Sequence, residues 1–445
     1  TNSIRSPLTN LYMLGIVLPT LGLALLPLAS TLLQGLLKWY HVFVLFNLII
    51  PFFVFYLTSQ VMLRRPGGYG EASVIENNPL YNKFASKKAY IKSFLICLPL
   101  LIIAALPFIF NTGLFGVKDF SFSQLGMSFL GDIKFFDFIG NFPFGVVAVL
   151  LSLFIPLAIA LFFSIAYKSR TREIIKSRED TKKLEDEFAS SLFQLGNRLG
   201  DGMPAEIAFG RVAEETSNAG GFYKIVNTNI HQLGMSLENA IFNKSNGAII
   251  YYPSALIATS MRILIEAVKK GLQVAANSLM SISEYVKNIQ KINQRLKDLL
   301  AEITSDMQSN MTFLAPLLAG IVVGLASMIT LILVRLKSIT DLTGNQEIAG
   351  FGSLSSITTI FDPTYMISPY FIQLVIGIYL VEIVFILTST LVTVDAGEDR
   401  LKKVYDTGRN LGSSLLLYFV TSLLAIVILS LVAGVAIGGM TGVGG

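Results

Sequence analysis

The feature that most constrains this chain is a series of apolar stretches, each long enough to cross a lipid bilayer as a helix. A crossing helix needs about 20 apolar residues. Such stretches occupy residues 9–33, 42–63, 90–110, 145–167, 312–335, 370–394 and 412–439. Only 14% of the residues are charged and 53% are hydrophobic, whereas soluble domains carry about 25% charged residues. The sequence therefore predicts an all-α polytopic membrane protein with about seven transmembrane helices.

Positive charges predict the direction of these helices, because Lys and Arg are enriched in cytoplasmic loops. The basic residues gather in the loops after the second and the sixth span: Arg64, Arg65, Lys83, Lys87, Lys88, Arg400, Lys402, Lys403 and Arg409. The segments 111–144 and 338–369 have few basic residues or none and hold several Asp and Glu residues. We therefore expect a cell-membrane protein with a cytoplasmic N-terminus and an external C-terminus.

These assignments divide the chain into segments. The second span follows the first at once, so we interpret residues 1–63 as a transmembrane hairpin rather than as a signal peptide. The other segments are a short cytoplasmic loop (64–89), helices 3 and 4 with an external loop (90–167), a cytoplasmic helical-bundle domain (168–311), helices 5 and 6 with an external loop (312–394), a basic cytoplasmic loop (395–411) and helix 7 (412–445).

The segment 168–311 has the residue spacing of a helical bundle. Apolar residues recur every three or four positions along its first helix, at Phe188, Leu192, Leu195 and Leu199. Gly202 and Pro204 then end this helix and begin the next. Residues 238–257 contain Gly, Pro, Tyr251 and Tyr252 and predict a bend between helices. Since no proline lies between Pro253 and Pro316, long helices can join this domain to the membrane.

Several of these motifs resemble those of one protein family. The stretch FASSLFQLGNRLGDGMP at 188–204, the bend at 238–257 and Lys270-Gly271 are similar to the cytoplasmic domain of type II secretion F proteins. More narrowly, this pattern and the segment DAGEDRLKKVY at 395–405 are similar to the archaeal platform proteins of type IV pili and archaella. The resemblance covers roughly Lys168 to the C-terminus. It rests on helix-capping and packing motifs rather than on catalytic residues.

The resemblance implies a non-enzymatic membrane platform for filament assembly. A hexameric secretion ATPase would dock on its cytoplasmic side, and pilin subunits would be its cargo. A homodimer is the geometry that we expect at the centre of such a symmetric motor. The chain departs from the family at 64–89, which is too short for the second cytoplasmic domain that many members carry.

Some of the conspicuous residues have two interpretations each. The basic residues Arg400, Lys402, Lys403 and Arg409 are either a topology anchor or a docking surface for an acidic face of the ATPase. Gly202, Pro204, Tyr251 and Tyr252 are either fold determinants or a surface for the same partner.

Three further features lie within the spans. Glu382 is a carboxylate deep in the sixth span, where a charge costs about 2.5–3.5 kcal/mol, so it should face protein or be protonated. We interpret it as an interhelical hydrogen-bonding group or as a contact for the N-terminal amine of a pilin. Two glycine pairs at four-residue spacing, Gly320 with Gly324 and Gly434 with Gly438, predict close helix packing within one subunit or between two.

The sequence also argues against several kinds of chemistry. We find no phosphate-binding loop and no arrangement of Ser, His and Asp residues that indicates catalysis. With one cysteine, Cys97, and two distant histidines, we expect no metal or cofactor, and the modest charge of +5 indicates no nucleic-acid partner. Two alternatives to the platform remain, namely a secondary transporter and the permease subunit of an ATP-driven transporter.

Overall fold

The computed structural model describes residues 15, 17–33, 35–63, 87–112, 119, 135–139, 142–216, 220–343, 362–397 and 399–441. Most of the predicted loops 64–89, 111–144 and 338–369 therefore lie outside the described residues. The described part is all-α apart from a two-stranded antiparallel pair, β1 (Phe138–Ile139) and β2 (Phe142–Pro143). The prediction of an all-α polytopic membrane protein is confirmed.

Within the described residues, six helices are long and apolar enough to cross a membrane. They lie within Trp39–Gln60, Lys88–Asn111, Val146–Gly200, Leu272–Ser338, Pro369–Ala396 and Arg400–Val435, and they match the second to the seventh predicted spans. The first predicted span, 9–33, begins outside the described residues. Its described part forms two short helices, α2 (Leu18–Ala24) and α3 (Leu26–Leu32), each started by a proline in the first turn.

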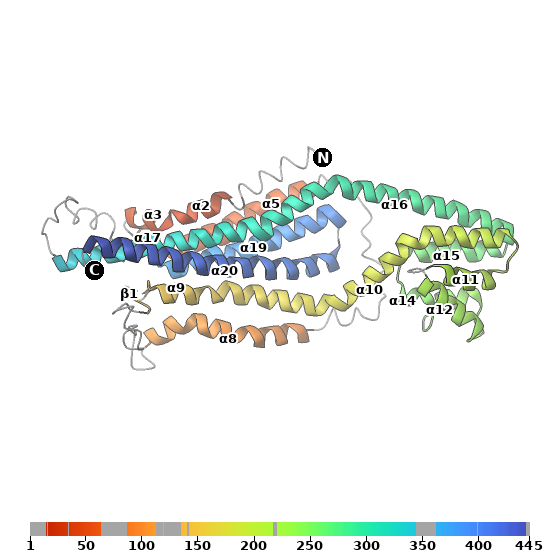
Figure 1. Ribbon diagram of the computed structural model, residues 1–445, viewed down its shortest axis with the longest axis horizontal. Helices are drawn as coiled ribbons and strands as arrows, with labels where there is room; N and C mark the ends of the chain where they lie inside the picture. The colour runs from red at the N-terminus through yellow and green to blue at the C-terminus, as the bar shows by residue number, and fades with distance from the viewer. Residues whose placement is uncertain are drawn as a thin grey trace.

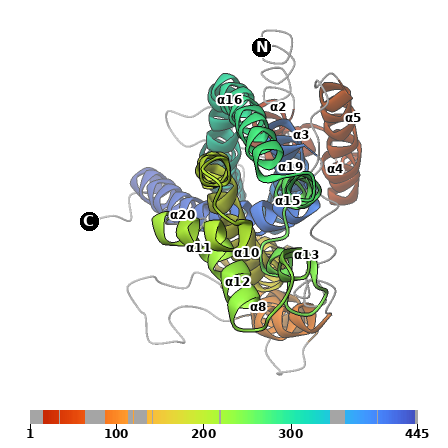
Figure 2. The same ribbon diagram turned by 90° about the vertical axis from the view of Figure 1, so that its right-hand side faces the viewer.

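The membrane bundle is built around α19 (Pro369–Ala396), which has the largest buried share of the six candidate spans, 67%. The helices around it are α4 (Trp39–Val44), the π-helical turn η2 (Leu45–Ile49), α5 (Ile50–Leu63), α9 (Val146–Ser152), α10 (Phe154–Gly200), α17 (Ala315–Thr343) and α20 (Arg400–Thr441). Helix α8 (Lys88–Asn111) packs mainly on α10. Helices α5 and α8 lie on opposite sides of this bundle (Figure 1 and Figure 2).

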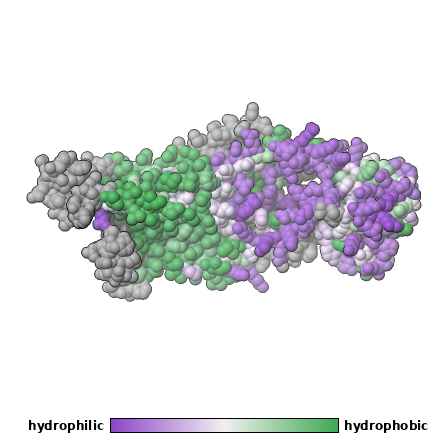
Figure 3. Space-filling model, in the orientation of Figure 1, coloured by the Kyte–Doolittle hydropathy of each residue, from purple (hydrophilic) through white to green (hydrophobic). Residues whose placement is uncertain are grey.

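Two long helices connect the bundle to a polar helical domain. Helix α10 has 47 residues and runs from the bundle into the domain (Figure 1). Helix α16 (Leu272–Ser309) returns and continues through a π-helical turn, η5 (Asn310–Leu314), into α17. Figure 3 shows that the bundle presents an apolar surface, whereas the far end of both helices is hydrophilic.

The helical domain encloses its own core. Between α10 and α16 lie α11 (Ala205–Glu215), α12 (Gly220–His231), α13 (Leu237–Phe242), α14 (Ala248–Tyr251) and α15 (Ala255–Val268). The predicted stripe of Phe188, Leu192, Leu195 and Leu199 is buried in this core to 1% exposure or less. At about 25 cal/mol per Å² of apolar surface, such burial is the main stabilising term of a small domain.

Candidate functional site

Helices α10 and α20 approach closely where they leave the membrane bundle. A Cβ atom on Gly408 would lie 2.9 Å from Cβ of Tyr167, and one on Gly412 would lie 2.8 Å from Oγ of Ser164. The Ser164 hydroxyl donates a buried hydrogen bond to the Gly408 carbonyl oxygen at 2.6 Å. Gly408 and Gly412 therefore form a contact surface of small residues for α10, which the sequence analysis missed although their four-residue spacing is its usual signal.

Ion pairs extend this joint beyond the glycines. Arg178 of α10 pairs with Asp399, whose side chain is only 6% exposed. Asp399 also accepts a hydrogen bond from the Lys402 backbone N–H at 2.9 Å and so caps the first turn of α20. Ile174 and Leu401 form a small buried cluster beside it. The joint thus holds α10 against the turn between α19 and α20.

The predicted basic cluster of Arg400, Lys402, Lys403 and Arg409 lies at this joint. It belongs to helix α20 rather than to a loop. The sequence analysis placed it in a loop at 395–411, but α19 ends at Ala396 and α20 begins at Arg400, because Gly397 adopts the left-handed φ of +82° that ends a helix. Lys402 pairs with Asp395 and Arg409 with Asp406. Arg400 is exposed and Lys403 half-buried, and no ion pair of either is found among the described residues.

The predicted bend at 238–257 is a folded corner of the helical domain. Ser236 and Ser254 cap α13 and α15 with their side-chain oxygens. Asn229 of α12 donates hydrogen bonds to the carbonyl oxygens of Ala240 at 3.0 Å and of Asn246 at 2.8 Å, which fixes the turn between α13 and α14. A Cβ atom on Gly247 would lie 2.5 Å from the Asn243 carbonyl oxygen, so only glycine fits this turn.

The tyrosines of this corner have different environments. Tyr251 is 55% exposed. Tyr252 is half-buried and packs edge-on against Phe222, with 6.2 Å between the ring centroids. Its hydroxyl occupies space beside Gly221 that a Cβ atom would fill. Tyr252 therefore serves the domain core, and Tyr251 is available to a partner.

Gly202 and Pro204 lie at the opposite turn of the domain, between α10 and α11. Gly202 has a φ of +84°, and no atom lies within 4 Å of the position of its missing Cβ. Pro204 precedes the first residue of α11, and its carbonyl oxygen accepts the N–H of Ala208 at 3.0 Å. Both residues have a clear conformational role.

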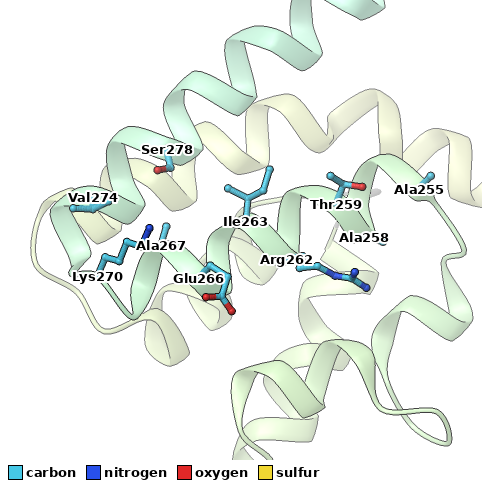
Figure 4. A pocket seen from close by; sticks show the side chains of 10 residues that line it. All are labelled: Ala255, Ala258, Thr259, Arg262, Ile263, Glu266, Ala267, Lys270, Val274 and Ser278. Atoms are coloured by element: carbon cyan, nitrogen blue, oxygen red, sulfur yellow. The ribbon is translucent and has the colours of Figure 1, made fainter.

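An open groove of about 590 Å³ lies between α15 and α16 (Figure 4). Small side chains such as Ala255, Ala258 and Ala267 line it. Arg262 and Glu266 of α15 and Lys270 of the turn that follows add charge to its edge (Figure 4). The groove thus combines small apolar side chains with charged side chains at its edge.

The charged side chains beside this groove interact with one another and with the bend at 238–257. Arg262 lies over the ring of Phe242 in α13, 5.5 Å from its centroid. The Lys269 ammonium donates a hydrogen bond to Glu266 at 2.9 Å and lies 4.0 Å from Glu238. This hydrogen bond and the charge of Lys269 lower the pKa of the Glu266 carboxyl, and the same contact raises the pKa of Lys269. Both groups therefore stay ionised near neutral pH.

Glu382 lies on the only side of α19 that is not fully buried. The half-buried residues of this stripe are Phe371, Leu374, Ile378, Glu382, Phe385, Ile386 and Ser389, most of them three or four residues apart. Oxygen Oε2 of Glu382 is buried and has no hydrogen-bond partner among the described residues. Asn47 of η2, a turn that packs on α19, has both side-chain polar atoms buried and likewise unpartnered within the described part of the chain. Ser422 and Ser430 of α20 also have buried hydroxyls without a partner within the described residues, so Glu382 is the one carboxylate among four such side chains of the membrane bundle.

The two predicted glycine pairs differ in their surroundings. Gly320 and Gly324 of α17 face α20, where added Cβ atoms would lie 2.2 Å from Oγ1 of Thr421 and 2.5 Å from Cβ of Ala425. This pair packs within one subunit. Gly434 of α20 has no atom within 4 Å of its missing Cβ, and the side-chain surroundings of Gly438 lie outside the described residues.

Within the described part of the chain no group of three or more His, Cys, Asp or Glu side chains is placed to hold a metal ion. Comparison with known proteins adds no family: no family model, no curated protein and no solved structure matches the chain. The interpretation of function therefore rests on the sequence motifs and on the geometry described above.

Proposed function

We propose that this protein is the membrane platform of a type IV filament assembly machine, a pilus or an archaellum. In this role it is not an enzyme. It docks a cytoplasmic hexameric secretion ATPase through the helical domain and the start of α20, and it transmits the movement of that motor to pilin subunits in the membrane. The motifs at 188–204, 238–257 and 395–405 resemble that family.

The observation that carries the proposal is the helical continuity between the helical domain and the membrane bundle. The helix from Leu272 to Ser338 has 67 residues, which corresponds to about 100 Å at 1.5 Å per residue. Helix α10 forms a second connection of 47 residues. Since helices transmit displacement without a flexible linker, a force on the helical domain reaches the bundle directly. A transporter needs no such lever.

Two surfaces support the docking part of the proposal. Arg400 and Lys403 present positive charge beside the joint of α10 and α20, so an acidic face of a motor would meet them there. The groove between α15 and α16 offers a second contact at the far end of the domain.

Glu382 supports the pilin part of the proposal. A buried carboxylate oxygen without a partner is costly in the membrane. The N-terminal amine of an incoming pilin helix would supply both a positive charge and hydrogen-bond donors. The variant Glu382→Gln keeps the size of the side chain and removes its charge, so we expect filament assembly to fail in this variant while the protein still inserts and purifies normally.

The test of the proposed function uses the full chain and a hexameric secretion ATPase from the same cell. Deletion of the gene should abolish surface filaments, and the purified protein should capture the ATPase hexamer. The double variant Arg400→Glu/Lys403→Glu should lose this capture, whereas Lys287→Glu, an exposed charge on α16, should retain it. Uptake of a small solute into vesicles that contain only this protein, with normal filaments on the deletion strain, would instead establish a transporter.

A further inference from the structure

Asn47 and Glu382 leave hydrogen-bonding atoms without a partner inside the membrane bundle. Asn47 is 7% exposed, and its amide nitrogen and amide oxygen are both buried and unpartnered in the part of the chain that the structure describes. Oxygen Oε2 of Glu382 is in the same state. The serine hydroxyls of α20 can turn to a carbonyl oxygen of their own helix, but amide and carboxylate oxygens only accept hydrogen bonds. Since such burial is costly in lipid, these two side chains call for a ligand.

An aromatic contact shows that the two side chains face the same helix interface. Trp39, the first residue of α4, stacks on Phe371 near the start of α19, with 4.9 Å between the ring centroids. Glu382 follows Phe371 by eleven residues, which at about 100° per residue returns it to within about 20° of the same side of α19. Asn47 follows Trp39 by eight residues, which make about two turns because they include part of the wider turn η2.

The two side chains also lie at a similar depth. Helix α19 packs on α4, on η2 and on α5, which are successive segments of one span and lie beside it in Figure 2. Helices that ran in opposite directions from the aromatic contact would separate before α5, so they run parallel. At 1.5 Å per residue, Asn47 lies about 12 Å and Glu382 about 16 Å from that contact, a difference of less than one helical turn. They do not bond to each other, so their atoms are available to a third group.

The three unpartnered atoms define the chemistry of that group. Oxygen Oε2 of Glu382 and the amide oxygen of Asn47 accept hydrogen bonds, whereas the amide nitrogen of Asn47 donates them. An α-ammonium group has three donors and a charge that compensates the carboxylate. The carbonyl oxygen of the residue that carries this ammonium accepts the bond from the Asn47 amide nitrogen. A metal cation would satisfy both oxygens but not this nitrogen, so the N-terminus of a peptide fits the three atoms better.

We propose that Asn47 and Glu382 form one intramembrane site for the free N-terminus of an apolar helix. Glu382 binds the α-ammonium group, and Asn47 binds the ammonium and the first peptide carbonyl group. The inference rests on the proposed function, which supplies a pilin helix as the ligand, and adds to it a second residue and a requirement for an unmodified amine. Because Glu382 lies on the half-buried stripe of α19, a helix can reach it from the lipid.

Stability and binding should change in different directions when Asn47 is replaced. Asn47→Leu removes both unpartnered atoms and keeps a similar volume, so the Tm of the solubilised chain should stay the same or rise. The same variant should bind the ligand several-fold more weakly. A residue that served only the packing of the bundle would instead lower the Tm on this substitution. A fall in Tm with unchanged binding would therefore overturn the role of Asn47.

Trp39 provides the binding readout, because it is the only tryptophan of the chain and lies on the same side of its span as Asn47. The probe is a synthetic apolar helical peptide without tryptophan, reconstituted with the full chain in lipid nanodiscs. The matched probe is the same peptide with an acetylated N-terminus. The free peptide should change the Trp39 fluorescence saturably, and the acetylated one should bind about tenfold more weakly or less. Glu382→Gln should remove this preference, whereas Ser422→Ala in α20 should keep it.

The outcomes separate this site from the proposed function. Absence of a preference for the free peptide, including absence of binding by either peptide, overturns the site. Displacement of the free peptide by sodium chloride but not by choline chloride also overturns it, because the site would then hold a metal cation. If deletion of the gene abolishes filaments while acetylation has no effect, the site fails and the platform stands. If the deletion strain keeps its filaments while the preference for a free amine holds, the platform fails and the amine site stands.

Discussion

Replacing Gly324 by alanine measures how closely α17 and α20 pack in the membrane. The new Cβ atom would lie 2.5 Å from Cβ of Ala425 and 2.8 Å from its backbone carbonyl carbon, so the two helices must move apart. Overpacking of this kind costs about 1–3 kcal/mol. Alanine also favours the helix by about 1 kcal/mol relative to glycine, which offsets part of that cost.

The control is Gly434→Ala in α20, where no atom lies within 4 Å of the added carbon. It has the same gain in helix propensity but no steric cost. The difference between the two variants therefore isolates the overpacking, and we expect Gly324→Ala to be about 1–3 kcal/mol less stable than Gly434→Ala. At about 2–4 °C per kcal/mol, this corresponds to several degrees in apparent Tm.

Trp39 provides the probe for this comparison, because it is the only tryptophan of the chain and stacks on Phe371 of α19 with 4.9 Å between the ring centroids. Its fluorescence during heating of the solubilised protein reports the loss of bundle packing. If Gly324→Ala melts at the same temperature as Gly434→Ala or above it, the close approach of α17 and α20 is refuted.

Three further predictions concern the helical domain and its joint. Gly202→Asn should keep the Tm close to that of the unmodified chain while Gly202→Val lowers it, because asparagine tolerates a φ of +84° and a β-branched residue does not. Arg178→Met should cost about 1–3 kcal/mol by leaving the buried Asp399 without its cation, and adding Asp399→Asn should recover part of this loss of Tm. Burial raises the pKa of Tyr223 above its usual 10, so above pH 10 the tyrosine ionises more readily in the unfolded chain than in the folded domain. The stability of the domain is therefore unaffected by this group below pH 10 and falls as the pH rises further. Tyr223→Phe should therefore cost about 1 kcal/mol near neutral pH, through its lost hydrogen bond with Ser191, yet lose less helical circular dichroism than the unmodified chain above pH 10.

The membrane helices and several helix ends could be predicted because their signals are local. Apolar length identifies the spans, and the helix end at Gly202 depends on a single residue that tolerates the left-handed backbone conformation. The predicted loop at 395–411 is wrong over 400–411, because a group of basic residues does not distinguish a loop from the exposed first turns of a helix. Gly397 ends α19, and Asp399 caps the first turn of α20. These two residues indicate in the sequence where α20 starts.

The joint of α10 and α20 could not be predicted in the same way. Arg178 and Asp399 are 221 positions apart in the sequence, and only the packing of α10 on α20 brings them together. The unpartnered oxygen of Glu382 follows in the same way from the packing of α19.

The π-helical turn η5 sets the angular phase between the two halves of the longest helix. A turn of this kind accommodates one residue more than an α-helical turn, and one residue corresponds to a rotation of about 100°. Deleting one residue within Asn310–Leu314 would therefore let this turn become α-helical and leave α16 and α17 in nearly the same angular relation, whereas deleting one residue from the regular helix beside it would rotate α16 by about 100° relative to α17. That rotation would turn the helical domain relative to the membrane bundle, although no contact inside either half had changed. The five residues of η5 thus fix the orientation of the helical domain relative to the membrane bundle.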